Sequence, residues 1–122
     1  MTLELVLPRD RNAEAKIERL AASRLEPFAA PTLAFVADFS RRLLEDPGIR
    51  AYPELVALGY WFRASALHRL RERHAALGGS GVLRPRGVVF QIAPSNVDSI
   101  FVYSWLLSML CGNRNIVRHS SR

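Results

Sequence analysis

The residues best suited to ligand chemistry in this chain form a short polar turn, Pro94-Ser95-Asn96. The turn follows the apolar run 87–92 and precedes an apolar stretch, a pattern that predicts a strand, a turn and a helix in that order. Ser95 or Asn96 can cap the helix, and Asp98 suits the positive end of its dipole. Helix N-termini hold anions, and ligands of α/β sheets lie beyond the carboxyl ends of the strands. The turn is therefore the candidate ligand site.

Three elements must position this turn. The run 87–92 is rich in β-branched and aromatic residues, and we predict a buried strand there. Residues 97–111 are apolar on nearly every side until Gly112-Asn113, which predicts a buried crossover helix. Residues 115–118 supply a second short strand. The whole stretch has the length of a βαβ motif, roughly thirty residues.

Three segments of this unit carry a likeness to a known family. They are Ile92-Ala93-Pro94-Ser95-Asn96-Val97, then Gly112-Asn113, then the run NIVRHSSR at 115–122. In order and spacing they resemble the acyl-CoA reductase (LuxC) family, a branch of the aldehyde dehydrogenase superfamily. The first segment is similar to the superfamily's I-x-P-W-N-F turn, with Ser95 where many aldehyde dehydrogenases carry Trp. Arg118 replaces the usual Lys after the second strand, and both departures suit the acyl-CoA reductase branch.

The resemblance implies a role for each residue of the turn. Asn96 would donate its side-chain amide to the oxyanion of a thiohemiacetal, as the Asn of the superfamily's turn does. The backbone before Asn96 would line a nicotinamide cofactor, and Arg118 would lie at the adenosine ribose. An Arg there can pair with a 2′-phosphate, so NADPH is expected, with NADH as the alternative. The cofactor-binding set is thus Ile92, Ala93, Pro94, Ser95, Arg118 and Ser120, and no metal is expected.

The implied activity is reduction of a fatty acyl thioester to an aldehyde through a thioacyl intermediate on a Cys. The family's catalytic Cys would lie far downstream of the turn, so we expect the chain to be an N-terminal fragment that is inactive by itself. The acyl donor would be acyl-CoA or an acyl-carrier thioester. The full-length protein is expected to be a cytoplasmic homo-oligomer.

The rest of the chain reads as helical packing. Apolar periodicity and caps predict helices over 12–24, 32–44 and 53–77, followed by the glycine-rich stretch 78–81. Those glycines follow a helix and precede a strand, the reverse of a phosphate-binding loop. The expected fold is α/β. Residues 1–81 form a helical lead-in, and residues 82–122 form the first, incomplete βαβ unit of an aldehyde dehydrogenase-like (Rossmann-type) cofactor domain.

Other candidate groups have simpler interpretations. Cys111 is the only thiol, but a buried position at the negative end of a helix disfavours a thiolate, so we reject it as nucleophile. His68 and His74 lack a second metal ligand at helical spacing, and His119 has no carboxylate beside it in sequence. Tyr60, Trp61 and Phe62 are predicted to pack in the core, with an acyl-chain pocket as the alternative.

Charge and hydropathy limit the classes of partner. The net charge of +6, carried almost entirely by Arg, favours phosphate-bearing partners without an obvious stripe. The single Cys fits a reducing compartment, and the longest apolar stretch is shorter than a membrane span. Nucleic acid is not the expected partner. An Arg-rich helical module for nucleic acid or an acidic partner is nevertheless the competing interpretation, and a scaffold related to the family is a third.

Overall fold

The computed structural model describes residues 12–79, 81–94 and 99–119. The turn residues Ser95 and Asn96, and Ser120, lie outside the described residues. Helices and strands follow in the order α1 (Ala13–Ala22), α2 (Ala30–Glu45), the 3-10 helix η1 (Pro47–Ala51), α3 (Pro53–Trp61), α4 (Ala64–Leu77), β1 (Val88–Ile92), α5 (Ile100–Leu110) and β2 (Arg114–Arg118). No helix in the described ranges is long and apolar enough to cross a membrane.

The two strands form a parallel pair joined by α5, as the sequence predicts. Val88 pairs with Arg114 at one end of the ladder, and Ile92 pairs with Arg118 at the other. Both strands begin within one residue of their predicted starts and end where predicted. A parallel pair needs a crossover connection, and α5 provides it. The fold of the described chain is therefore of the α/β type, with one βαβ unit.

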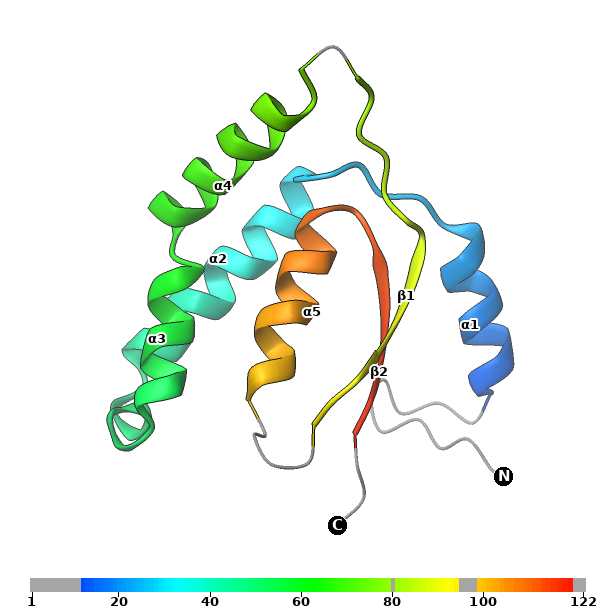
Figure 1. Cartoon of the computed structure of the whole chain (residues 1–122). Helices are drawn as coiled ribbons and strands as arrows, with labels where there is room; N and C mark the ends of the chain where they lie inside the picture. Colours follow the sequence, from blue (N-terminus) through cyan, green and yellow to red (C-terminus); the bar gives the residue numbers. More distant parts are fainter. Residues whose placement is uncertain (1–11, 80, 95–98, 120–122) are drawn as a thin grey trace.

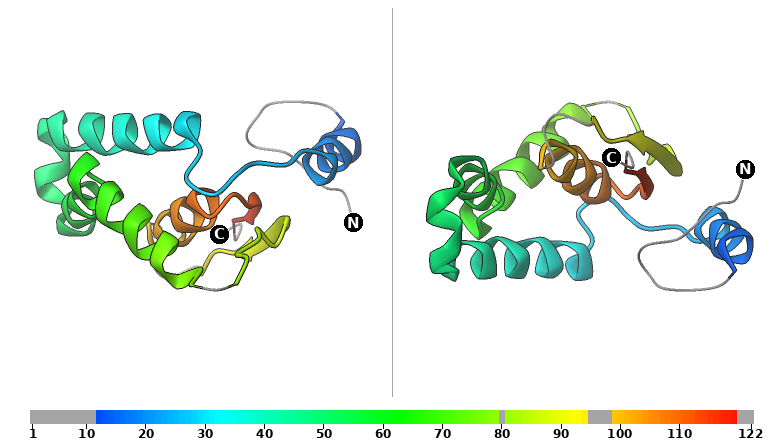
Figure 2. Two further views of the ribbon diagram at one scale, coloured as in Figure 1. Left: turned by 90° about the horizontal axis from the view of Figure 1, so that it is seen from above. Right: turned by 90° about the horizontal axis from the view of Figure 1, so that it is seen from below.

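Helix α5 lies at the centre of the molecule, between the helices α2, α3 and α4 on one side and the two strands on the other (Figures 1 and 2). The core contains buried side chains from each of these helices and from the α3–α4 connection: Val36, Leu58, Phe62, Leu67, Leu106 and Leu110. Helix α1 lies on the far side of the strands and buries none of its residues. The lead-in helices and the βαβ unit thus share one hydrophobic core.

Small residues form the contact between α2 and α3. The buried Ser40 hydroxyl donates a 2.6 Å hydrogen bond to the Gly59 carbonyl oxygen. A Cβ atom at Gly59 would lie 2.7 Å from Leu44 Cδ2, so only glycine fits without a shift of that leucine. This contact fixes α3 against α2, and thereby the direction in which the chain leaves α3.

The long helix predicted over 53–77 is wrong, because the chain turns between α3 and α4. Arg63 is extended, with φ −63° and ψ 155°, and its carbonyl oxygen accepts from the N–H groups of Ala66 and Leu67. The turn buries Phe62 completely in the core. Burial of a large aromatic side chain offsets the lost helical hydrogen bonds.

The expectation of a buried first strand is also wrong for one face of β1. Val88, Phe90 and Ile92 alternate along the strand and are exposed, Ile92 by 69%. A parallel sheet is buried on both faces only where helices cover both. In the described part of the chain this face of β1 has no cover.

Candidate functional site

The carboxyl ends of β1 and β2 bring together four of the seven expected site residues. Ile92 is the register partner of Arg118, and the Ala93 N–H extends the ladder with a 2.9 Å hydrogen bond to the Arg118 carbonyl oxygen. Ala93 is buried, whereas Ile92 and Pro94 are exposed. The segment that leads into the Ser95–Asn96 turn therefore lies beside the end of β2.

Arg118 presents an exposed side chain at this edge of the sheet. Among the described residues it has no carboxylate within ion-pair distance, so its charge is available to an anion. The neighbouring His119 ring contacts the edge of Phe101 on α5, with the ring centroids 4.6 Å apart. That contact gives His119 a packing role beside the site.

Asn113 holds the opposite end of β1, a function that the sequence analysis missed. Its side-chain Oδ1 accepts hydrogen bonds from the Arg86 N–H at 2.7 Å and from the Gly87 N–H at 3.2 Å. The Gly87 carbonyl oxygen in turn accepts from the Arg114 N–H. Asn113 is thus more than a helix stop, because it fixes the register in which β1 meets β2. The contact joins residues 26 and 27 positions apart, so no local sequence signal indicates it.

Gly112 allows the chain to turn sharply between α5 and β2. Its φ is +85°, and a Cβ atom there would lie 2.7 Å from the Leu25 carbonyl oxygen. The same junction holds the connection after α1, because the Phe28 N–H donates to the Leu110 carbonyl oxygen at 2.7 Å. The glycine is required by both its conformation and the close approach of another segment.

Cys111 occupies the C-cap position of α5, directly before Gly112. Burial raises the pKa of its thiol above the ordinary value, so the reactive thiolate is disfavoured. This agrees with the rejection of Cys111 as a nucleophile.

The histidines offer no metal site in the described part of the chain. His68 Nε2 lies 3.2 Å from Glu72 Oε1 on the exposed side of α4. His74 packs against Phe28, with the ring centroids 5.1 Å apart.

Part of the positive charge is neutralised within α2. Asp38 accepts hydrogen bonds from Arg41 and Arg42, and these, in that order, lower the pKa of its carboxyl. Arg41 also pairs with Glu45 at 2.8 Å. This helix therefore offers less charge to a nucleic acid than its sequence suggests.

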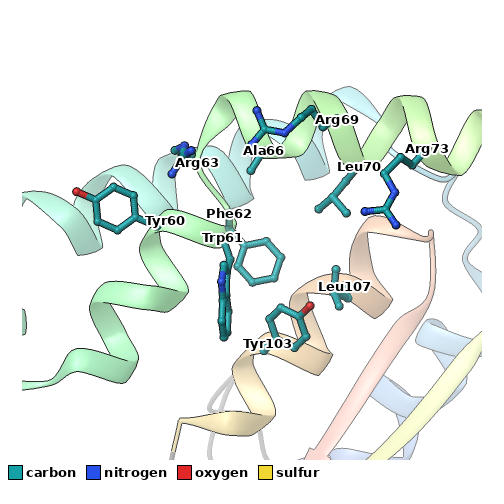
Figure 3. Close-up of a pocket in the computed structure, with 10 residues that line it drawn as sticks. All are labelled: Tyr60, Trp61, Phe62, Arg63, Ala66, Arg69, Leu70, Arg73, Tyr103 and Leu107. Atoms are coloured by element: carbon teal, nitrogen blue, oxygen red, sulfur yellow. The ribbon is translucent and has the colours of Figure 1, made fainter.

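A hollow of about 480 Å³ opens between the end of α3, α4 and the middle of α5 (Figure 3). Trp61, Phe62 and Tyr103 form an aromatic wall, and arginines of α4 lie along the other side. The expected core role holds for Phe62, which is fully buried. It is wrong for Tyr60 and Trp61, each more than half exposed, because Leu58 and Phe62 occupy the buried face at the end of α3.

Comparison with known proteins connects these features to one family. The family model described as "Acyl-CoA reductase (LuxC)" matches residues 63–122, which include α4, both strands and α5. A search of curated proteins and a search of solved structures each give no match. The resemblance found in the turn and strand residues is thereby confirmed. Residues 63–122, about half of the chain, therefore match the acyl-CoA reductase (LuxC) family.

Proposed function

We propose that this chain is part of an enzyme that reduces a fatty acyl thioester to an aldehyde with NADPH. The family of residues 63–122 supports a thioester substrate and the oxidoreductase class. The observation that carries the proposal for the cofactor is the parallel pairing of Ile92 with Arg118. This pairing brings an exposed cation beside the strand end that leads into the Pro94 turn.

The residues at this edge fit a nicotinamide dinucleotide. The exposed side chains of Ile92 and Pro94 offer apolar surface to a flat ring, and the buried Ala93 stands between them in the sequence. Arg118 can form a charge-assisted pair with a 2′-phosphate, which NADPH has and NADH lacks. When bound, NADPH supplies the hydride. Ser95 and Ser120 are proposed to hydrogen-bond the cofactor; both lie outside the described residues, so their roles rest on their places in the sequence.

Asn96 is proposed as the donor that stabilises the oxyanion. The superfamily's turn has an Asn at this position, and a preorganised amide lowers the barrier where negative charge develops. Asn96 lies two residues beyond Pro94 and outside the described residues, so its role rests on its place in the sequence.

The nucleophilic thiol is proposed to come from outside these 122 residues. Cys111 is the only cysteine in the sequence, and its burial at the C-terminal end of α5 disfavours the thiolate. The chain alone is therefore expected to be inactive. Formation of a homo-oligomer by the full-length protein stays a prediction.

The cofactor role can be tested by fluorescence titration of the protein made from the complete reading frame. Wild type should bind NADPH more tightly than NADH. Arg118→Gln should weaken NADPH binding roughly tenfold to hundredfold, because the binding free energy of one hydrogen bond to a charged group corresponds to that factor. NADH binding should be nearly unchanged. Arg50→Gln, an exposed charge change in η1, is the matched control. Equal affinity of wild type for the two cofactors would refute the preference.

The role of Asn96 has its own test in the same protein. Asn96→Ala should lower kcat by about 10²–10³ while KM for the acyl thioester changes little, because the bond is made in the transition state. An unchanged kcat would remove Asn96 from the mechanism.

A further inference from the structure

We propose that the hollow between α3, α4 and α5 binds a nucleoside diphosphate, with the phosphates at Arg69 and Arg73 and the base against Trp61. None of the residues that line this hollow is among those assigned to the nicotinamide cofactor. The inference rests on the charge, the aromatic wall and the size of the hollow, and it does not depend on the proposed reductase activity.

Among the described residues, the charge of the lining is entirely positive. Arg63, Arg69 and Arg73 line the hollow, and no Asp or Glu of the described ranges does. Arg63 is partly engaged, since its Nε donates to Ser65 Oγ and its guanidinium lies 5.5 Å from the centre of the Tyr60 ring. Arg69 and Arg73 form no ion pair or hydrogen bond with any side chain in the described ranges. Two guanidinium groups are therefore available to an anion.

The spacing of these two arginines suits neighbouring phosphates. Arg69 and Arg73 are four residues apart on α4, which places their Cβ atoms roughly 5–6 Å apart on one helix face. Figure 3 shows both side chains on the α4 side of the hollow, with Arg73 reaching toward Leu107 and Arg69 lying along the helix beside Ala66. Guanidinium groups bind phosphate oxygens through two parallel hydrogen bonds, which suits this pair to a diphosphate.

The aromatic wall suits a flat base. Trp61 is 54% exposed although its ring contacts Tyr103, with the centroids 5.0 Å apart. Tyr103 is braced in turn by the buried Phe62 at 5.6 Å. The Trp61 ring is held in an edge-to-face contact and is still half exposed, so it offers a stacking surface, and every nucleobase has a face that can use it.

Charge and volume favour a nucleotide over other anions. A fatty acid carries one negative charge and would leave the cluster of three guanidinium groups largely uncompensated. An inorganic anion would leave the aromatic wall exposed. A volume of about 480 Å³ falls in the range of small-molecule sites. A nucleoside diphosphate satisfies the charge, the wall and the volume together.

The test is titration of the 122-residue chain with ADP by isothermal calorimetry. Pyrophosphate, adenosine and decanoate are the comparison ligands. ADP should saturate one site and bind more tightly than each of the three. Equal binding of pyrophosphate would mean that the aromatic wall is unused, and tighter binding of decanoate would mean an amphiphile site. Either result, or no saturation by ADP, overturns the proposal.

Single variants on α4 and α3 locate the site. Arg69→Gln and Arg73→Gln should each weaken ADP binding roughly tenfold to hundredfold, and Trp61→Leu by a similar factor through lost stacking. Arg71→Gln is the matched control, because Arg71 is exposed on the same helix but does not line the hollow. All four positions are exposed, so thermal unfolding should be similar. A loss in Arg71→Gln as large as in Arg73→Gln would show general attraction by positive charge, and so refute the site.

Discussion

Asn113→Ala removes the acceptor that holds the start of β1. In the wild type, Asn113 Oδ1 accepts two backbone N–H groups, from Arg86 at 2.7 Å and from Gly87 at 3.2 Å. Asn113 itself is buried, with 9% of its surface exposed. After the substitution, both N–H groups lose their protein partner at the position where β1 enters the sheet. We therefore expect loss of stability and loosening of this end of the strand.

The magnitude follows from the two hydrogen bonds. Each intramolecular bond contributes about 1 kcal/mol net, and both are only part-buried, so water can partly replace the lost acceptor. The free energy of unfolding should fall by about 2 kcal/mol. For a domain of this size that loss lowers Tm by roughly 6–12 °C.

Urea unfolding of the chain measures the stability, and amide hydrogen exchange by NMR measures the local effect. Exchange of the Arg86 and Gly87 amides should accelerate more than the global loss of stability explains. Asn115→Ala is the matched control. Its Oδ1 accepts from the Gln91 side chain and its Nδ2 donates to the Asn113 carbonyl oxygen, so it binds neither the Arg86 nor the Gly87 N–H. A loss below about 0.5 kcal/mol, or unchanged exchange at Arg86 and Gly87, would refute the role assigned to Asn113.

Three further predictions concern α5 and the junction after it. Ser108→Ala should raise the free energy of unfolding in urea by about 1 kcal/mol, because the buried Ser108 hydroxyl has no hydrogen-bond partner among the described residues. A fall in stability would show that the hydroxyl does have a partner. Gly112→Ala should lower the free energy of unfolding by more than about 2 kcal/mol, since backbone strain at φ +85° adds to a clash with the Leu25 carbonyl oxygen. Gly79 has φ +41° and open space around it, so Gly79→Ala should lower the free energy of unfolding by only about 1 kcal/mol. Equal losses in Gly79→Ala and Gly112→Ala would contradict the clash at Gly112. Iodoacetamide should alkylate Cys111 more slowly at pH 8 in the folded than in the urea-unfolded chain, because the raised pKa leaves less thiolate, and equal rates would refute this.

Local sequence signals predicted the βαβ unit well. Gly87 and Pro94 flank β1, and Gly112 directly precedes Asn113 at the turn into β2; each acts on the backbone conformation of its own neighbourhood. Such signals do not depend on what packs nearby. The co-location of Ile92 with Arg118 followed from the parallel pairing that a crossover helix implies.

The remaining features depend on contacts between distant segments. The apolar pattern runs through Phe62 without interruption, and only the position of α2 and α5 makes a turn there favourable. The hollow likewise needs Tyr103 of α5 opposite the arginines of α4, a juxtaposition between segments some thirty residues apart. Tertiary packing determines both the turn after Phe62 and the hollow, and periodicity within one segment carries no information about packing between segments.

The proposed cofactor turn depends on a strand that is fixed at both ends. At its start, Asn113 holds Arg86 and Gly87; at its finish, the Ala93 N–H binds the Arg118 carbonyl oxygen. Between these points β2 is the only strand of the described ranges that pairs with β1, and one face of β1 is exposed. A one-residue slip would exchange the faces of the strand and move Pro94 relative to Arg118. The hydrogen bonds at the two ends oppose that slip. Asn113 therefore acts as a positioning residue for the cofactor turn, although it lies at the other end of the strand.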